Sequence, residues 1–140
     1  MSGGDGSPRA ARLAERWPLA VDGGYGVRDL LLAAYADPRR GYHDLRHLAE
    51  VLDHLDLLLD GLDPDDAREV DTGAVRLAAW FHDAVYAGAP DDEERSARLA
   101  ETELSALALD TAVVAEVARL VRLTATHDPA DDDLAGALLS

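Results

Sequence analysis

Near the middle of the chain, an apolar run ends in a histidine and an aspartate: Val75-Arg76-Leu77-Ala78-Ala79-Trp80-Phe81-His82-Asp83. Its leucine and alanine content favours a helix, and Trp80 and Phe81 are expected in the core. An imidazole beside a carboxylate can bind a divalent ion such as Mn, Fe, Co, Ni, Zn or Mg. Adjacent residues diverge by about 100° on a helix, but both can reach one ion near a helix end. We therefore expect a buried helix with a metal-binding end.

The rest of the chain also has a helical pattern. Leucine and alanine dominate, and runs that alternate between apolar and polar residues are missing. Helices are predicted over about 9–17, 26–37, 42–60, 65–85, 91–107, 110–126 and 131–139, with prolines at their edges. Asp91 or Asp92 is expected to cap the fifth of these helices and Asp110 the sixth. The sequence therefore predicts an all-α, single-domain helical bundle.

The chain of 140 residues fits one domain with a real core. Residues 1–8 are rich in glycine and are expected to be a disordered leader, so the predicted domain spans residues 9–140. Every apolar run is broken by charge well before the ~18 residues of a membrane span, and the N-terminus lacks a signal-peptide core. We therefore expect no membrane partner and a cytoplasmic location.

Two missing residue types restrict the chemistry. The chain has no cysteine and no lysine, and its 13 basic residues are all arginine. Thiolate catalysis, Schiff-base chemistry and a phosphate-binding lysine are therefore excluded. The net charge of −15 argues against a nucleic-acid polymer as partner, because such binding needs a basic surface. Any metal must be held by His, Asp or Glu.

The predicted helix 42–60 has two distinct sides. A leucine stripe is expected to face the core: Leu45, Leu48, Leu52, Leu55 and Leu59. His43, His47 and His54 fall on the other side. Although surface histidines are the simpler interpretation, the i, i+4 spacing of His43 and His47, together with the His82–Asp83 pair, favours a site. We interpret His54 as a surface residue.

Two further segments carry candidate groups. Glu93 and Ser96 share one face of the predicted helix 91–107, where a carboxylate could orient a water molecule. The alternative is an acidic first turn that complements the helix dipole. His127 follows the predicted helix 110–126, either as a cation at a helix C-terminus or as a ligand or phosphate-contacting group.

Four motifs occur in an order that resembles the small bacterial branch of the HD-domain superfamily, a group of predicted metal-dependent phosphohydrolases. They are Tyr42-His43-Asp44-Leu45-Arg46-His47, Trp80-Phe81-His82-Asp83-Ala84-Val85-Tyr86, Asp92-Glu93-Glu94-Arg95-Ser96-Ala97 and Thr124-x-x-His127. The resemblance covers about residues 35–127. It implies a helical HD-type bundle that hydrolyses a small phosphorylated metabolite or nucleotide with a divalent metal ion.

The resemblance also implies roles for individual residues. His47, His82 and Asp83 would be metal ligands, with His43 as a neighbour or alternative that contacts substrate. The remaining roles are catalytic, for Asp83, Glu93 and His127, and phosphate-binding, for Arg46 and Arg95.

The chain departs from the family pattern at its end. The last family ligand is an aspartate in an Asp-Ala-Asp-Leu-like stretch, and this chain ends at Leu138-Leu139-Ser140, about where that stretch would begin. Asp131, Asp132 and Asp133 come earlier and have the pattern of helix caps. Three explanations stay open: the chain is truncated, it lacks this ligand, or one of these aspartates takes its place. The alternatives to a hydrolase are a degenerate HD domain that binds a ligand or partner without turnover, which the missing aspartate favours, and a helical bundle whose histidines are only structural.

Overall fold

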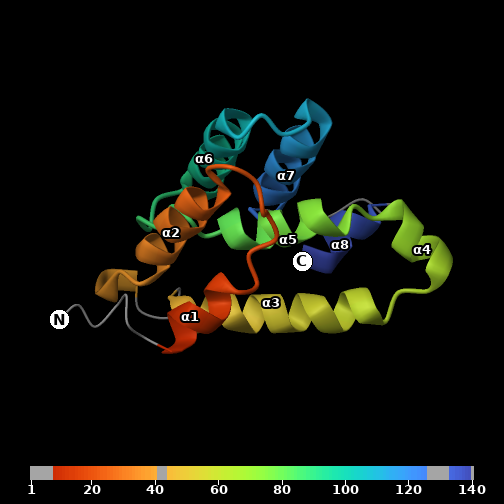
Figure 1. Cartoon of the computed structure of the whole chain (residues 1–140), viewed down its shortest axis with the longest axis horizontal. Helices are drawn as coiled ribbons and strands as arrows, with labels where there is room; N and C mark the ends of the chain where they lie inside the picture. The colour runs from red at the N-terminus through yellow and green to blue at the C-terminus, as the bar shows by residue number, and fades with distance from the viewer. Residues whose placement is uncertain (1–7, 41–43, 126–132, 140) are drawn as a thin grey trace.

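The computed structural model describes residues 8–40, 44–125 and 133–139, which are mostly helical (Figure 1). The described residues form α1 (Pro8–Ala14), α2 (Gly24–Tyr35), a 3-10 turn (Pro38–Arg40), α3 (Leu45–Asp60), α4 (Pro64–Glu69), α5 (Thr72–Phe81), α6 (Asp92–Ala106), α7 (Thr111–Leu123) and α8 (Leu134–Leu139). No strand occurs among them. The all-α bundle predicted from the sequence is confirmed. None of these helices is both long and apolar enough to cross a lipid bilayer.

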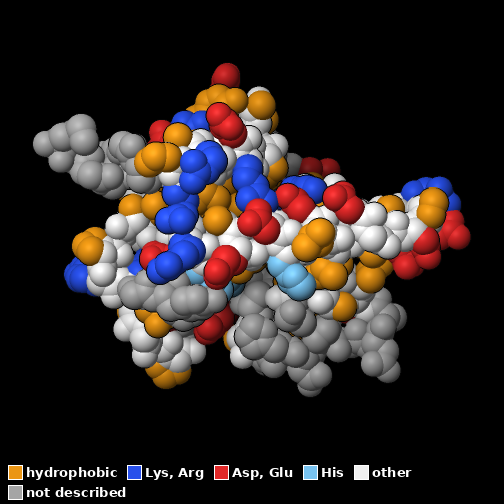
Figure 2. Space-filling view, turned by 90° about the horizontal axis from the view of Figure 1, so that it is seen from below, with side chains coloured by type: hydrophobic (Ala, Val, Ile, Leu, Met, Phe, Trp, Pro, Cys, Tyr) orange, Lys and Arg blue, Asp and Glu red, His pale blue; other side chains and the backbone are white. Residues whose placement is uncertain are grey.

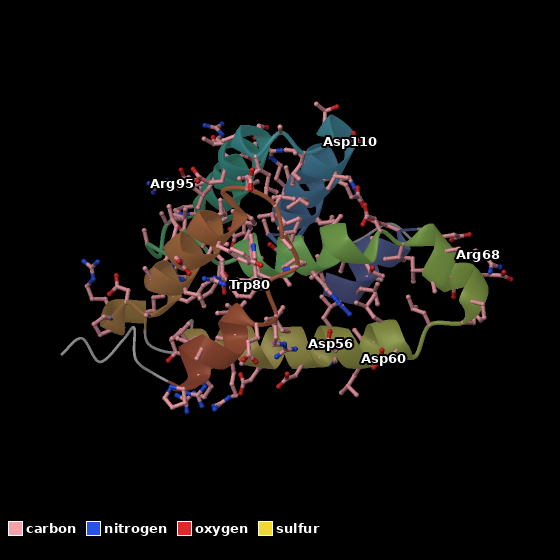
Figure 3. All side chains as sticks on the ribbon, viewed as in Figure 1. Asp56, Asp60, Arg68, Trp80, Arg95 and Asp110 are labelled. Atoms are coloured by element: carbon pink, nitrogen blue, oxygen red, sulfur yellow. The ribbon has the colours of Figure 1, made fainter. Side chains whose placement is uncertain are left out.

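Helix α5 is the central element of the bundle. It packs against α3, α6, α7 and α8, and in Figure 1 it crosses the middle of the molecule. Trp80 and Phe81 are fully buried, as expected, and Trp80 lies at the heart of the bundle (Figure 3). The Trp17 ring meets Trp80 edge to face, with ring centroids 5.1 Å apart. This arrangement holds the C-terminal end of α5 firmly in place.

Helix α3 runs along one side of α5, below it in Figure 1. Leu48, Leu52 and Leu55 are buried, and Leu45 and Leu59 are partly buried against the same core. The predicted leucine stripe is therefore confirmed. Because α1 and α2 pack on α3 near its N-terminal end, that end lies within the bundle rather than projecting from it.

Helices α6 and α7 form a hairpin that rises from α5 (Figure 1). The Asp110 carboxylate accepts a hydrogen bond from the Ala112 amide at 2.9 Å, which confirms the predicted cap of α7. Across the hairpin, the Arg122 guanidinium donates to the carboxylates of Glu94 and Glu101. The hairpin is thus joined by ionic hydrogen bonds as well as by apolar packing.

Two local predictions were wrong. The single helix expected over 65–85 is two helices, because Val70 is extended (φ −101°, ψ 128°) and the Asp71 carboxylate caps α5 through the Ala74 amide at 3.0 Å. The second of these helices ends at Phe81 rather than at residue 85. Asp91 and Asp92 do not cap α6 as expected: Asp91 makes no capping hydrogen bond, and Asp92 accepts from amides in the preceding loop.

Candidate metal centre

Three predicted ligands meet where α3 begins and α5 ends. One ligand atom from each of His47, His82 and Asp83 lies within 4.8 Å of the other two. Asp83 Oδ2 lies 3.5 Å from His47 Nε2 and 3.4 Å from His82 Nε2. Two ligands that each lie about 2.0–2.2 Å from one tetrahedral ion are about 3.3–3.6 Å apart. The observed spacing therefore fits a shared ion and needs only small side-chain movements to close around it.

The hydrogen bonding of His82 leaves its Nε2 atom suited to bind a metal. Its Nδ1 atom lies 2.6 Å from the Ala79 carbonyl oxygen, which can only accept a hydrogen bond. Nδ1 must therefore carry the proton, and in the neutral ring Nε2 carries the lone pair that faces Asp83. A backbone carbonyl that orients the outer nitrogen is the usual support for a metal-binding imidazole.

The N-terminal cap of α3 positions His47. The Asp44 side chain accepts hydrogen bonds from the amides of Arg46 and His47, at 3.0 and 3.3 Å. His47 thus lies in the first turn of a capped helix, where its backbone is fixed. Its side chain is 18% exposed and that of Asp83 16%, so the site can be reached from solvent while its groups are partly desolvated.

Arg40 and Tyr35 hold the backbone of the His82–Asp83 segment. The Arg40 guanidinium donates to the carbonyl oxygens of Asp83 and Ala84, each at 2.6 Å, and also to that of Ala34. The Tyr35 hydroxyl donates to the Trp80 carbonyl oxygen at 2.9 Å and accepts from the Asp83 amide at 3.2 Å. Burial, and then the Asp83 charge, raise the pKa of Tyr35, so its hydroxyl keeps its proton. Together, Arg40 and Tyr35 fix the backbone of Asp83 on both sides.

The loop after Asp83 is braced by α6. Asp92 Oδ2 accepts from the amides of Ala87, Gly88 and Ala89, at 2.9 to 3.3 Å. The buried Ser96 Oγ accepts from the Val85 amide at 3.0 Å. Asp92 and Ser96 therefore have a structural role: they anchor the loop that follows the candidate ligands.

A hollow of about 210 Å³ adjoins the site on one side of α3. Its described lining combines His47, His54 and Glu50 with an apolar wall from α3 and from Leu138 and Leu139 of α8. Helix α8 packs on both α3 and α5. The hollow beside His47 therefore offers a small ligand both polar groups and apolar surface.

Of the remaining predicted site residues, the structure describes only Arg46, Arg95 and Glu93. Arg46 lines a different hollow, between α1 and α3. Arg95 is exposed on the outer side of α6 (Figure 3). Glu93 is half-buried in the first turn of α6 and does not belong to the candidate ligand group. His43 and His127 lie outside the described residues, as do Asp131 and Asp132. Asp133 accepts from the Gly136 amide at 3.0 Å, as expected of a capping residue.

Arg40 and Tyr35 were missed by the sequence analysis. Their partners are backbone carbonyls and amides, which no pattern of residue types reveals. The only signal is that Tyr35 continues an apolar i, i+4 series with Val27 and Leu31, all three of which are buried.

Comparison of the chain with models of protein families, with curated proteins and with solved structures finds no match. The function is therefore inferred from the geometry of His47, His82 and Asp83 and from the order of motifs along the sequence. The geometry favours a divalent ion with nitrogen and oxygen ligands.

Proposed function

We propose that this protein is an HD-type metal-dependent phosphohydrolase that acts on a small phosphorylated metabolite or nucleotide. The observation that carries the proposal is the shared approach of His47 Nε2 and His82 Nε2 to one oxygen of Asp83. Two imidazoles and a carboxylate suit a hydrolytic metal. The motif order read from the sequence supports the same class.

At such a site, different residues of the chain would bind the metal, activate the water and bind the substrate. His47, His82 and Asp83 would hold the ion, which supplies a Lewis acid for the phosphoryl oxygen and lowers the pKa of a coordinated water. Three protein ligands leave coordination positions open for water and substrate. The carboxylate of Asp83 would orient or deprotonate the attacking water. Glu93 and His127 stay candidates for catalytic roles, and His43 and Arg95 for substrate binding.

The substrate class follows from size and charge. The hollow beside His47 is small, and the chain has a net charge of −15. A polymeric polyanion would be repelled, whereas one phosphate group can be attracted by a bound cation. We therefore propose a small phosphate ester as substrate rather than a nucleic-acid polymer. The cytoplasmic location expected from the sequence stays a prediction.

A second candidate is a degenerate HD domain that binds a ligand or partner without turnover. The observation that favours it is the size of the ligand group, which contains only three of the described residues. A fourth protein ligand would tighten the hold on the ion. Turnover separates the two candidates, because both require bound metal.

The test combines metal analysis with turnover of a generic phosphate ester in the presence of added Mn²⁺ or Co²⁺. His82→Ala and Asp83→Ala should each weaken metal binding by more than the roughly 10–100-fold typical of losing an outer-sphere partner, while helical circular dichroism is retained. Asp91→Ala is the matched control, because Asp91 is exposed and makes no capping bond. It should keep the metal.

The outcomes divide the candidates clearly. Bound metal with turnover that disappears in both variants supports the hydrolase. Bound metal without turnover of any phosphate ester supports the binding module. If the parent protein binds no divalent ion and both variants unfold, the histidines are structural and the proposal fails.

A further inference from the structure

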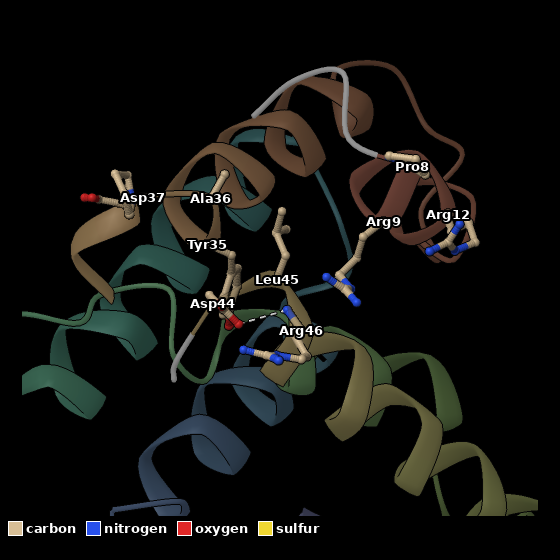
Figure 4. A pocket seen from close by; sticks show the side chains of 10 residues that line it. Pro8, Arg9, Arg12, Tyr35, Ala36, Asp37, Asp44, Leu45 and Arg46 are labelled. Atoms are coloured by element: carbon tan, nitrogen blue, oxygen red, sulfur yellow. Dashed lines mark hydrogen bonds between the residues drawn. The ribbon is translucent and has the colours of Figure 1, made fainter. Parts of the chain in front are cut away.

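Three arginines line a hollow between α1 and the start of α3. Two adjoining cavities, of about 370 and 430 Å³, share Arg9, Arg12 and Arg46 in their walls. Arg9 and Arg12 are three residues apart and so lie on one face of α1. In Figure 4, Arg9 reaches from α1 towards Arg46 on the neighbouring helix. The space is of the size that binds small molecules in proteins, about 300–1,000 Å³.

These three guanidinium groups form no ion pair with a described residue, although Asp37, Asp44, Glu50 and Asp53 also line the two cavities. The chain as a whole has 28 acidic and 13 basic residues. Arg16 differs, because it pairs with Asp53 at 2.7 Å and with Asp56 at 2.8 Å. The Asp44 carboxylate in the same wall is already engaged by the amides of Arg46 and His47.

The charge is also concentrated along the chain. Residues 1–46 contain seven of the 13 arginines but only six of the 28 acidic residues. Figure 2 shows a strip of basic side chains, with acidic side chains beside it, on the face seen from below Figure 1. In a protein with a net charge of −15, a hollow whose walls contain as many arginines as carboxylates differs from the acidic average of the chain.

We propose that this hollow binds a small ligand bearing a multivalent phosphate group. Like charges around one cavity repel one another, and a bound counter-charge lowers this cost. The planar guanidinium group donates two parallel hydrogen bonds to a phosphate, which makes arginine the preferred phosphate-binding side chain. Nucleic acid is a poorer occupant, because the rest of the molecule would repel a long polyanion.

This site is distinct from the candidate metal centre and goes beyond the proposed function. None of the three triad residues lines the arginine-rich hollow. Tyr35 lines the hollow and also bonds the Asp83 amide through its hydroxyl, so it stands between the two sites. Phosphate binding here needs no metal ion, and this property separates failure of this proposal from failure of the hydrolase proposal.

The test is isothermal titration of the full chain with inorganic pyrophosphate and, separately, with inorganic phosphate, in excess chelator and at constant ionic strength. The parent protein should show saturable binding. Arg9→Gln and Arg46→Gln should each weaken it by at least about tenfold, the loss expected for a hydrogen bond between charged groups. Arg68→Gln removes the same charge from exposed α4 and should change affinity by less than about twofold.

Circular dichroism checks that each variant is folded, and all three substitutions are at exposed positions. Saturable binding that persists without metal and fails only in the Arg9 and Arg46 variants supports the proposal. The proposal is overturned if the parent protein shows no saturable binding, or if Arg68→Gln weakens the binding as much as the other two substitutions do. It is also overturned if neither ion binds but Arg46→Gln abolishes a dimer in sedimentation, because the hollow would then be a contact between two copies.

Discussion

Arg40 shows how one buried charge can organise a site that it does not enter. Its side chain spans from α2 to the segment after α5 by donating to three carbonyl oxygens, and only 8% of the residue is exposed. The guanidinium also lies over the Tyr35 ring, 4.9 Å from its centroid. Lysine could not replace it, because one ammonium cannot reach three acceptors with this planar geometry.

Arg40→Gln should therefore lower both stability and metal affinity. Removing the guanidinium leaves the carbonyls of Asp83 and Ala84 without their donor, at an expected cost of about 2–4 kcal/mol in the free energy of unfolding. Urea denaturation measures this cost, and metal titration measures the effect on the site. Arg39→Gln is the control, because the Arg39 side chain is next in the chain and is 88% exposed. Equal stability of the two variants would contradict the role given to Arg40.

For individual residues, the sequence predicted some members of the candidate site and missed others. His47, His82 and Asp83 could be predicted to meet because metal-binding residue types recur at recognisable spacings. Arg40 and Tyr35 could not, because they act on backbone atoms. The phosphate-binding role that the resemblance implies for Arg46 stays a prediction; its side chain lines the α1–α3 hollow, whose described lining includes none of the three candidate ligands.

At the scale of elements, the helix pattern predicted which segments are helical better than it predicted where they end. Apolar periodicity continues through residues 65–85, but the Asp71 cap interrupts the helix there. Asp92 differs from Asp71: it lies at the start of α6, but its carboxylate accepts hydrogen bonds from the loop that precedes the helix rather than from the helix itself. A carboxylate near a helix start does not by itself determine which backbone amides it will accept from.

The α6–α7 hairpin has a predicted pH dependence. Hydrogen bonds from Arg122 and Arg98 lower the pKa of Glu94 from 4.5 to about 2. A lowered carboxylate pKa stabilises the folded state above pH 4.5, and the stabilisation is lost as the pH falls from 4.5 towards 2. The melting temperature of Glu94→Gln should therefore be lower than that of the parent protein at neutral pH. The difference between the two melting temperatures should become smaller as the pH falls through this range.

Thermal unfolding followed by circular dichroism at a series of pH values measures that gap. Glu69→Gln is the control, because Glu69 is exposed on α4 and forms no ion pair with any described residue. Its melting temperature should follow that of the parent at every pH. A gap for Glu94→Gln that stays constant down to pH 2 would contradict the assigned ion pair.

At the scale of the whole molecule, the candidate site depends on how two distant segments pack. His47 lies near the start of α3 and His82 at the end of α5, and these helices meet through the leucine stripe and the buried face of α5. The all-α class followed from periodicity and composition. The meeting of these particular helix ends was expected from the metal-binding residue types and from the resemblance, because periodicity indicates which faces are buried but not which helices pair.

The most direct test of the central claim is a Co²⁺ titration followed by visible absorption, because Co²⁺ reports its ligands and coordination number. If His47, His82 and Asp83 share an ion, the protein should bind about one Co²⁺ per chain and show the intense spectrum of a low-coordinate site with nitrogen and oxygen ligands. The spectrum should be lost in His47→Ala and kept in His54→Ala, an exposed histidine two turns along the same helix. If the spectrum remains that of hydrated Co²⁺, or if His47→Ala does not change it, α3 and α5 do not share an ion.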